Sequence, residues 1–201
     1  IVQKWETQFE PMLALRAMEK HLGRGVDAIV PFELGGLNTP VMLSLAARCG
    51  LPVVDGDGLG RAAPETQMTS FIGHGVSVTP MPLVDWKGNV VVVTEAATPF
   101  FPDEVGRFIV TAAGGLGANS HYPMSGAQAK EAVVPDSISL ALSLGRRLKG
   151  IREPQATADA LWEMLGGRLA FVGEVSSIRE EDALGFLVQT AILHGTGADR
   201  G

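Results

Sequence analysis

The stretch DGDGLGRAAPETQM, residues 55–68, concentrates side chains that could do chemistry. It places two carboxylates, Asp55 and Asp57, two positions apart after an apolar segment, and Glu65 follows. Side chains two apart at a strand end point the same way, so both aspartates could face one site. There they could ligate a metal ion, act as a general base or accept hydrogen bonds from a substrate. We expect these three residues to be catalytic, and a plain Asp-Gly turn is the alternative.

The same stretch offers groups that could bind a substrate. Gly58 would let the backbone approach a ligand closely, and Arg61 could hold a carboxylate through two parallel hydrogen bonds. Gln67 adds an amide. We expect all three to contact substrate. For Arg61, an ion pair with Glu65 across one helical turn is an equally good interpretation.

Two further polar loops are expected to complete the pocket. Residues 33–38, ELGGLN, follow one apolar segment, and residues 117–124, GANSHYPM, follow another. The predicted substrate-binding residues in these loops are Glu33, Gly35, Gly36, Asn38, Asn119 and His121. We also expect Asp55, Asp57 and His121 to hold a divalent metal such as zinc. No nucleotide cofactor is expected, because neither GxGxxG nor GxxxxGK[ST] occurs.

The elements that must position these loops alternate between strand and helix. Apolar segments at 27–32 and 51–54 enclose a helix that Thr39 caps, that has Pro40 at its first position and that Gly50 ends. This rhythm predicts an α/β domain with a mainly parallel sheet flanked by helices. Ligands of such sheets bind at the carboxyl ends of the strands, which would bring loops 33–38 and 55–68 together.

The remaining pattern predicts helices, one hairpin and a change of character near Gly166. Helices are expected to begin at Glu10, Pro64, Pro102, Asp136 and Thr157, and an apolar stripe of the third of them would hold Val105, Phe108, Ile109 and Ala112. Segments 76–84 and 90–94 flank a glycine-containing turn and predict a β-hairpin. Segments 168–175 and 186–193 indicate two strands with no helix after them. We therefore expect an α/β domain over 1–166 and the beginning of a β-rich second domain over 167–201.

Bulk composition excludes several classes of protein. The 201 residues are 46% hydrophobic and 19% charged, with a net charge of −6 and no basic patch interleaved with aromatics, so nucleic-acid binding is not expected. No apolar run reaches the ~18 residues that span a bilayer. The lone Cys49 indicates a reducing compartment, and we expect a cytoplasmic protein. The chain starts at Ile1, and we expect it to be an internal piece of a longer protein that lacks its natural N-terminal segment.

Three segments together resemble the S-methyl thiohydantoin desulfurase-like family. They are VDAIVPFELGGLNT, GLPVVDGDGLGRAAPETQMTS and NSHYPMSGAQAKEAVVPDSISLALSLGR, in this order. The resemblance implies an α/β domain followed by a β-rich one. It also implies a hydrolase of small cyclic ureides that converts an S-methyl thiohydantoin to a hydantoin. The alternative is a non-catalytic small-molecule-binding domain or subunit associated with hydantoinase- or oxoprolinase-type enzymes. We expect a homo-oligomer in either case.

Overall fold

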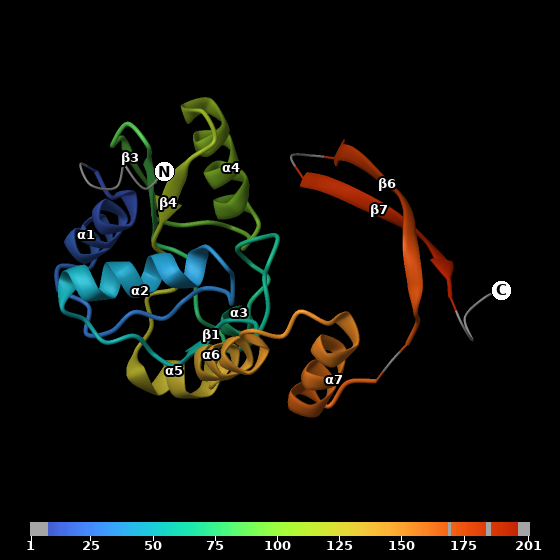
Figure 1. The fold of residues 1–201 in the computed structure, drawn as a ribbon. Coiled ribbons are helices and arrows are strands. Elements are labelled where there is room, and N and C mark those ends of the chain that lie inside the picture. Colours follow the sequence, from blue (N-terminus) through green and yellow to red (C-terminus); the bar gives the residue numbers. More distant parts are fainter. Residues whose placement is uncertain (1–7, 169, 184–185, 197–201) are drawn as a thin grey trace. The chain divides into compact units, whose positions relative to one another are not determined.

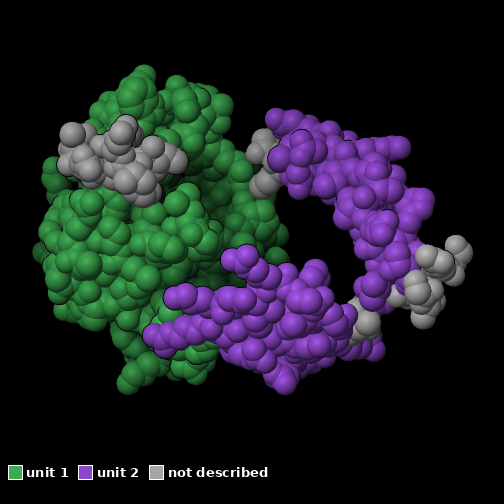
Figure 2. Space-filling model, in the orientation of Figure 1, with its two compact units in different colours: residues 1–143 green, residues 144–201 purple. Residues whose placement is uncertain are grey.

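The structure is a computed structural model that describes residues 8–168, 170–183 and 186–196. The chain divides into two compact units, residues 1–143 and 144–201 (Figure 2).

Unit 1 combines helices with short strands (Figure 1). The helices are α1 (Glu10–Leu22), α2 (Asn38–Cys49), α3 (Ser70–Gly73), α4 (Phe101–Ala113), α5 (Gly126–Ala132) and α6 (Ser137–Leu148), the last of which runs on into unit 2. The strands are β1 (Gly56–Asp57), β2 (Met81–Asp85), β3 (Val90–Val93), β4 (Gly117–Asn119) and β5 (Val134–Pro135). Among the described residues, no helix is long and apolar enough to cross a membrane.

The predicted mainly parallel sheet is wrong. The named strands of unit 1 form two antiparallel sheets, one in the order β3-β2-β4 and one of β1 with β5. Segments 27–32 and 51–54 meet at a single parallel bridge, in which Ile29 N donates to Pro52 O at 3.0 Å and Val54 N donates to Ile29 O at 2.9 Å. The next bonds of a parallel ladder would need the N–H groups of Pro31 and Pro52, which proline lacks. The ladder therefore stops after one bridge.

The central sheet holds the core of unit 1. All five residues of β2 are buried. Helices α1 and α4 both pack on β2 and β4, and the sheet lies between them in Figure 1. One apolar cluster joins this sheet to α3 and α5, and a second joins α1 to α2; their largest members are Phe71, Met81 and Tyr122 in the first and Phe9, Leu15 and Leu45 in the second.

Several predicted element ends are confirmed. Helix α1 begins at Glu10 and is followed by Gly23 in the left-handed region, and Gly50 follows α2 in the same way. The hairpin is present as β2 and β3, and the carboxylate of Asp85 accepts from Asn89 N at 2.8 Å in its turn.

Other local predictions are wrong for identifiable reasons. No helix begins at Pro64, and α3 covers only Ser70–Gly73. The backbone N–H groups of Ala63 and Thr66 donate to the side chains of Glu33 and Asp103 and not to helical carbonyl groups. Thr39 does not cap α2. Its hydroxyl lies inside the first turn, where it donates to Glu33 O at 3.1 Å. Phe108 of α4 is 72% exposed, so it does not belong to the apolar stripe.

Unit 2 consists of the end of α6, helix α7 (Pro154–Leu165) and an antiparallel hairpin of β6 (Gly173–Ala183) and β7 (Phe186–Gly195). Gly166 ends α7 as predicted. The expected strand 168–175 begins only at Gly173, and residue 169 lies outside the described residues. The domain boundary placed at Gly166 stays a prediction.

The packing around Gly58 generates a first prediction. A Cβ there would lie 2.8 Å from Phe32 O and 2.9 Å from Phe71 Cε2. Gly58→Ala should therefore lower the free energy of unfolding by about 1–3 kcal/mol through overpacking. Urea unfolding followed by circular dichroism measures this change.

Gly36→Ala is the matched control in the same unit. An added Cβ at Gly36 would meet nothing within 4 Å. Its unfolding midpoint should stay within error of the parent protein. Equal midpoints for both variants would contradict the tight packing at Gly58.

Candidate functional site

Unit 1 contains a cavity of about 950 Å³ whose polar wall joins segments that are distant in sequence. The wall takes Glu33 and Asn38 from the first polar loop, and Asn119 and His121 from the third. Asp103 and Arg107 of α4 also line it, and they were not predicted from the sequence. Four of the predicted substrate-binding residues thus share one cavity, and their roles remain predictions.

Glu33 connects the first polar loop to the DGDGLGRAAPETQM stretch. Its carboxyl group is buried; one oxygen accepts from Asn38 Nδ2 at 2.5 Å and the other accepts from the backbone N–H of Ala63. Gly35 N donates to Thr39 Oγ1 at 3.0 Å, which fixes the entry into α2. A buried carboxylate needs such donors, so the loop and the stretch are held together.

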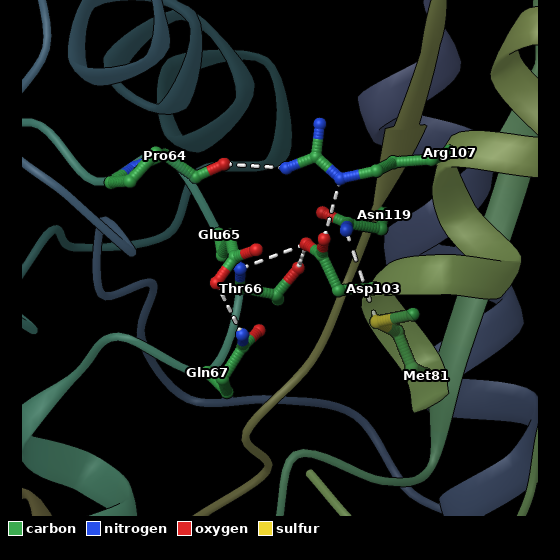
Figure 3. Close-up of polar contacts among 8 residues, drawn as sticks. All are labelled: Pro64, Glu65, Thr66, Gln67, Met81, Asp103, Arg107 and Asn119. Atoms are coloured by element: carbon green, nitrogen blue, oxygen red, sulfur yellow. Dashed lines mark hydrogen bonds and ion pairs between the residues drawn. The ribbon is translucent and has the colours of Figure 1, made fainter. Parts of the chain in front are cut away.

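Asp103 and Arg107 connect α4 to the same stretch (Figure 3). Asp103 Oδ1 accepts from the backbone N–H of Thr66 at 2.8 Å and from the Thr66 hydroxyl, and Asp103 Oδ2 accepts from Arg107 Nε at 2.7 Å. Arg107 Nη2 donates to Pro64 O at 2.6 Å. In the sequence, only the i, i+4 spacing of Asp103 and Arg107 could have drawn attention to them. Such a pair is common on exposed helix faces, so it does not indicate a site.

His121 contacts two aromatic rings. Its ring centroid lies 5.1 Å from that of Phe32 and 5.0 Å from that of Tyr122. Tyr122 has φ 54, in the left-handed region that bulky residues rarely adopt. Its hydroxyl donates to Thr66 O at 2.9 Å, and its ring meets Phe71 edge-on. These contacts hold the strained residue and, through it, the imidazole.

The environment of His121 favours the neutral imidazole. Burial lowers the pKa of His121 to about 4, and the nearby Asp103 carboxylate opposes this only in part. His121 Nδ1 is shut off from solvent and has no hydrogen-bond partner among the residues that the structure describes. At neutral pH the ring therefore carries one N–H donor and one acceptor.

Asp55 and Asp57 use their carboxylates within the fold. Asp57 is fully buried, and its oxygens accept from Leu59 N at 3.1 Å and from Gly60 N at 2.9 Å. Asp55 accepts from Ser139 N at 2.9 Å and from the Ser139 hydroxyl, and these bonds lower the pKa of Asp55. Neither aspartate is among the described residues that line the cavity. Their catalytic role stays a prediction.

The other predicted site residues are not among the described residues that line the cavity; they are Gly35, Gly36, Gly58, Arg61, Glu65 and Gln67. Gln67 Nε2 donates to Glu65 Oε2 at 2.6 Å, next to the hydrogen bonds between Asp103 and Thr66 (Figure 3). Arg61 is exposed and its guanidinium is 3.4 Å from Ala62 O. Gly58 packs against Phe32 and Phe71, as described above, and Gly36 is exposed in the turn before α2.

Asp55, Asp57 and His121, the expected metal ligands, form no ligand cluster among the described residues. Within the described ranges, no group of three His, Cys, Asp or Glu side chains could hold a metal ion together. To act as ligands, Asp55 and Asp57 would have to give up the hydrogen bonds that fix their loops. Metal binding by these two residues and His121 stays a prediction.

The lowered pKa of His121 generates a second prediction. Between about pH 6.5 and 4 the imidazole is protonated in the unfolded protein but stays neutral in the folded protein. The contribution of His121 to the free energy of unfolding is therefore fully present above this window and is lost as pH falls through it. The parent should lose roughly 2–3 kcal/mol more than His121→Gln across the window. Urea unfolding at about pH 7.5 and 4.5 measures the difference.

His21→Gln is the matched control, because His21 lies exposed near the end of α1. This variant should keep the full acid sensitivity of the parent. If His121→Gln lost as much stability as the parent on acidification, a buried neutral imidazole would be excluded.

Comparisons with known proteins agree with the resemblance seen in the sequence. The S-Me-THD-like N-terminal domain model matches residues 1–95, and the S-Me-THD-like C-terminal domain model matches residues 98–201. A search of curated proteins found no match.

Among solved structures, the chain is similar to the crystal structure of a protein from Chromobacterium violaceum, a target of the Northeast Structural Genomics Consortium. The two are 28% identical with a TM-score of 0.70, and the match covers 90% of this chain and 52% of that one. The chain thus spans about half the length of that relative. With both domain models matched over nearly all its residues, the chain belongs to the S-Me-THD-like family.

Proposed function

We propose that this chain belongs to a hydrolase of small cyclic ureides and that the substrate ring binds against Asn119 and His121. Family membership and the resemblance to thiohydantoin desulfurases support the reaction class. The cavity supports a small-molecule substrate, because ligand sites typically offer about 300–1,000 Å³ lined by apolar groups and a few polar ones.

The observation that carries the proposal is the uncommitted hydrogen-bonding capacity of these two neutral groups. Asn119 is exposed on the cavity wall, and its Nδ2 makes only a weak contact of 3.8 Å with Met81 Sδ among the bonds described. His121 Nδ1 lacks a partner among the described residues. A carboxamide presents a donor beside an acceptor, which matches the adjacent N–H and C=O of a lactam ring.

The chemistry would be hydrolysis at C2 of the ring. The oxygen of a water molecule forms a bond to C2 and the bond from C2 to sulfur breaks. One proton of the water leaves on sulfur as methanethiol, and the other ends on the adjacent ring nitrogen. C2 becomes a carbonyl carbon and the ring becomes a hydantoin. Because Nδ1 is closed to solvent, neutral His121 would accept a hydrogen bond from the attacking water through Nε2, and Asn119 would hold the ring amide.

A binding module without turnover is the second candidate. Two carboxylates of the cavity wall, Glu33 and Asp103, already accept hydrogen bonds from the Ala63–Thr66 segment. Neither is aimed at a ligand as an uncommitted base. The same pocket would then recognise a ureide for an associated hydantoinase- or oxoprolinase-type enzyme.

Release of methanethiol from an S-methyl thiohydantoin tests the proposal. The parent protein should release thiol, detected with a chromogenic disulfide. Asn119→Ala should lower kcat/KM at least about tenfold, because it removes a hydrogen-bonded pair from the complex.

Asn89→Ala is the matched control, since Asn89 binds Asp85 in the hairpin turn at 2.7 Å and makes no part of the proposed site. It should retain the parent rate. Tight binding of the thiohydantoin without thiol release would favour the binding module, and neither binding nor release would remove both candidates.

A further inference from the structure

The two strands of the hairpin in unit 2 differ in character (Figure 1). Strand β6 carries five charged side chains, at positions 174, 179, 180, 181 and 182. Strand β7 has none between Leu187 and Leu193. Its apolar residues come in adjacent pairs, Leu187 with Val188 and Ile192 with Leu193, so they point to both faces of the hairpin and are exposed there. A strand of this kind is typical of the interior of a sheet, whereas a charged strand is typical of an edge.

One edge of β7 is paired with β6, and the other edge has no strand beside it among the described residues. Just beyond β7, Thr196 N donates to Val172 O at 2.8 Å. Within β7, Ile192 O accepts from Ser176 Oγ at 3.2 Å. The backbone groups of the even-numbered residues therefore point toward β6, and those of the odd-numbered residues point away from it, because successive residues of a strand alternate between its edges. The residues whose N–H and C=O groups point to the free edge are Leu187, Gln189, Ala191 and Leu193.

The sequence along this free edge is self-complementary. The stretch LVQTAIL begins and ends with two apolar residues and has Thr190 at its centre. When two copies pair antiparallel about a two-fold axis at Thr190, Leu187 of one copy faces Leu193 of the other. Val188 faces Ile192 in the same way, and Thr190 faces itself, which is a favourable pair across strands. The outward-pointing residues then fall in hydrogen-bonded pairs, each of which exchanges two bonds.

We propose that β7 is a dimerisation strand, which pairs antiparallel with β7 of a second copy in the register centred on Thr190. The interface is isologous, because the same edge serves on both copies. The resulting sheet has the order β6-β7-β7-β6, with the charged strands outside. Charged edge strands oppose further pairing, so the assembly stops at two copies. A two-stranded hairpin alone is marginally stable in water, and this pairing adds the further strands that it needs.

Sedimentation equilibrium of the chain tests the number of copies. At about 100 µM the parent protein should have twice the monomer mass of 21.1 kDa. A parent that stays monomeric would overturn the pairing and leave the edge of β7 to a strand from another source. A mass that grows beyond two copies would overturn the closed four-stranded sheet.

Gln189→Pro tests the free edge of β7. The proline ring removes an outward N–H and obstructs a second strand, and the bonds from β7 to β6 do not use this N–H. The dissociation constant of the dimer should rise at least about tenfold, because each copy loses a bond to the other. Unchanged dissociation would overturn the proposal.

Glu180→Pro is the matched control. Glu180 faces Gln189 across the hairpin, so its N–H points outward from β6 in the same way. Both variants lose the side-chain hydrogen bond from Gln189 Nε2 to Glu180 Oε1. Glu180→Pro should keep the dissociation constant of the parent, and equal weakening by both variants would overturn the assignment to β7.

Cysteine cross-linking tests the register without disrupting a strand. In a Cys49→Ala background, Thr190→Cys should form a disulfide between copies when a copper oxidant is added. A pair that is not hydrogen-bonded brings its Cα atoms to about 4.5 Å, within disulfide reach. Ala191→Cys is the matched control, since Ala191 and its copy would be diagonal neighbours about 7–8 Å apart, beyond that reach. Equal cross-linking at both positions, or none at Thr190, would overturn the register.

Discussion

The architecture of the candidate site depends on how two carboxylates hold residues 63–66. Glu33 and Asp103 come from different segments of the cavity wall, and each accepts a backbone N–H from this short segment. Charge-assisted bonds of this kind are about twice as strong as neutral ones. They take the place of helical bonds in a segment with a helix-start signal, and they tie the residues at the beginnings of α2 and α4 to this one segment.

The sequence predicted local structure better than topology. A glycine that ends a helix and an apolar pattern that forms a hairpin both depend on residues close in sequence. The pattern alone therefore predicted α1, the ends of α2 and α7, and the β2–β3 hairpin. The sheet did not, because the rhythm of elements cannot tell whether two segments extend a ladder. Pro31 and Pro52 end the ladder because they lack the N–H groups that the next bonds would need. This effect can be predicted only once the register of the two segments is known.

For the candidate site, the sequence identified the loops and missed the helix between them. Glu33, Asn38, Asn119 and His121 attract notice as polar residues in loops, and all four line the cavity. Asp103 in a first helical turn has a sufficient local explanation in the helix dipole, so nothing in its neighbours signals a bond to Thr66, 37 positions away. For Asp57 the sequence signal was strong, but its carboxylate accepts hydrogen bonds within its own loop.

The left-handed backbone of Tyr122 has a mechanical consequence for the site. In an extended chain, neighbouring side chains point to opposite faces, yet the rings of His121 and Tyr122 lie 5.0 Å apart at their centroids. The cavity imidazole is therefore in tilted contact with the phenol ring whose hydroxyl bonds to Thr66. A displacement of Thr66 would therefore reach the imidazole through the Tyr122 hydroxyl and the contact between the two rings.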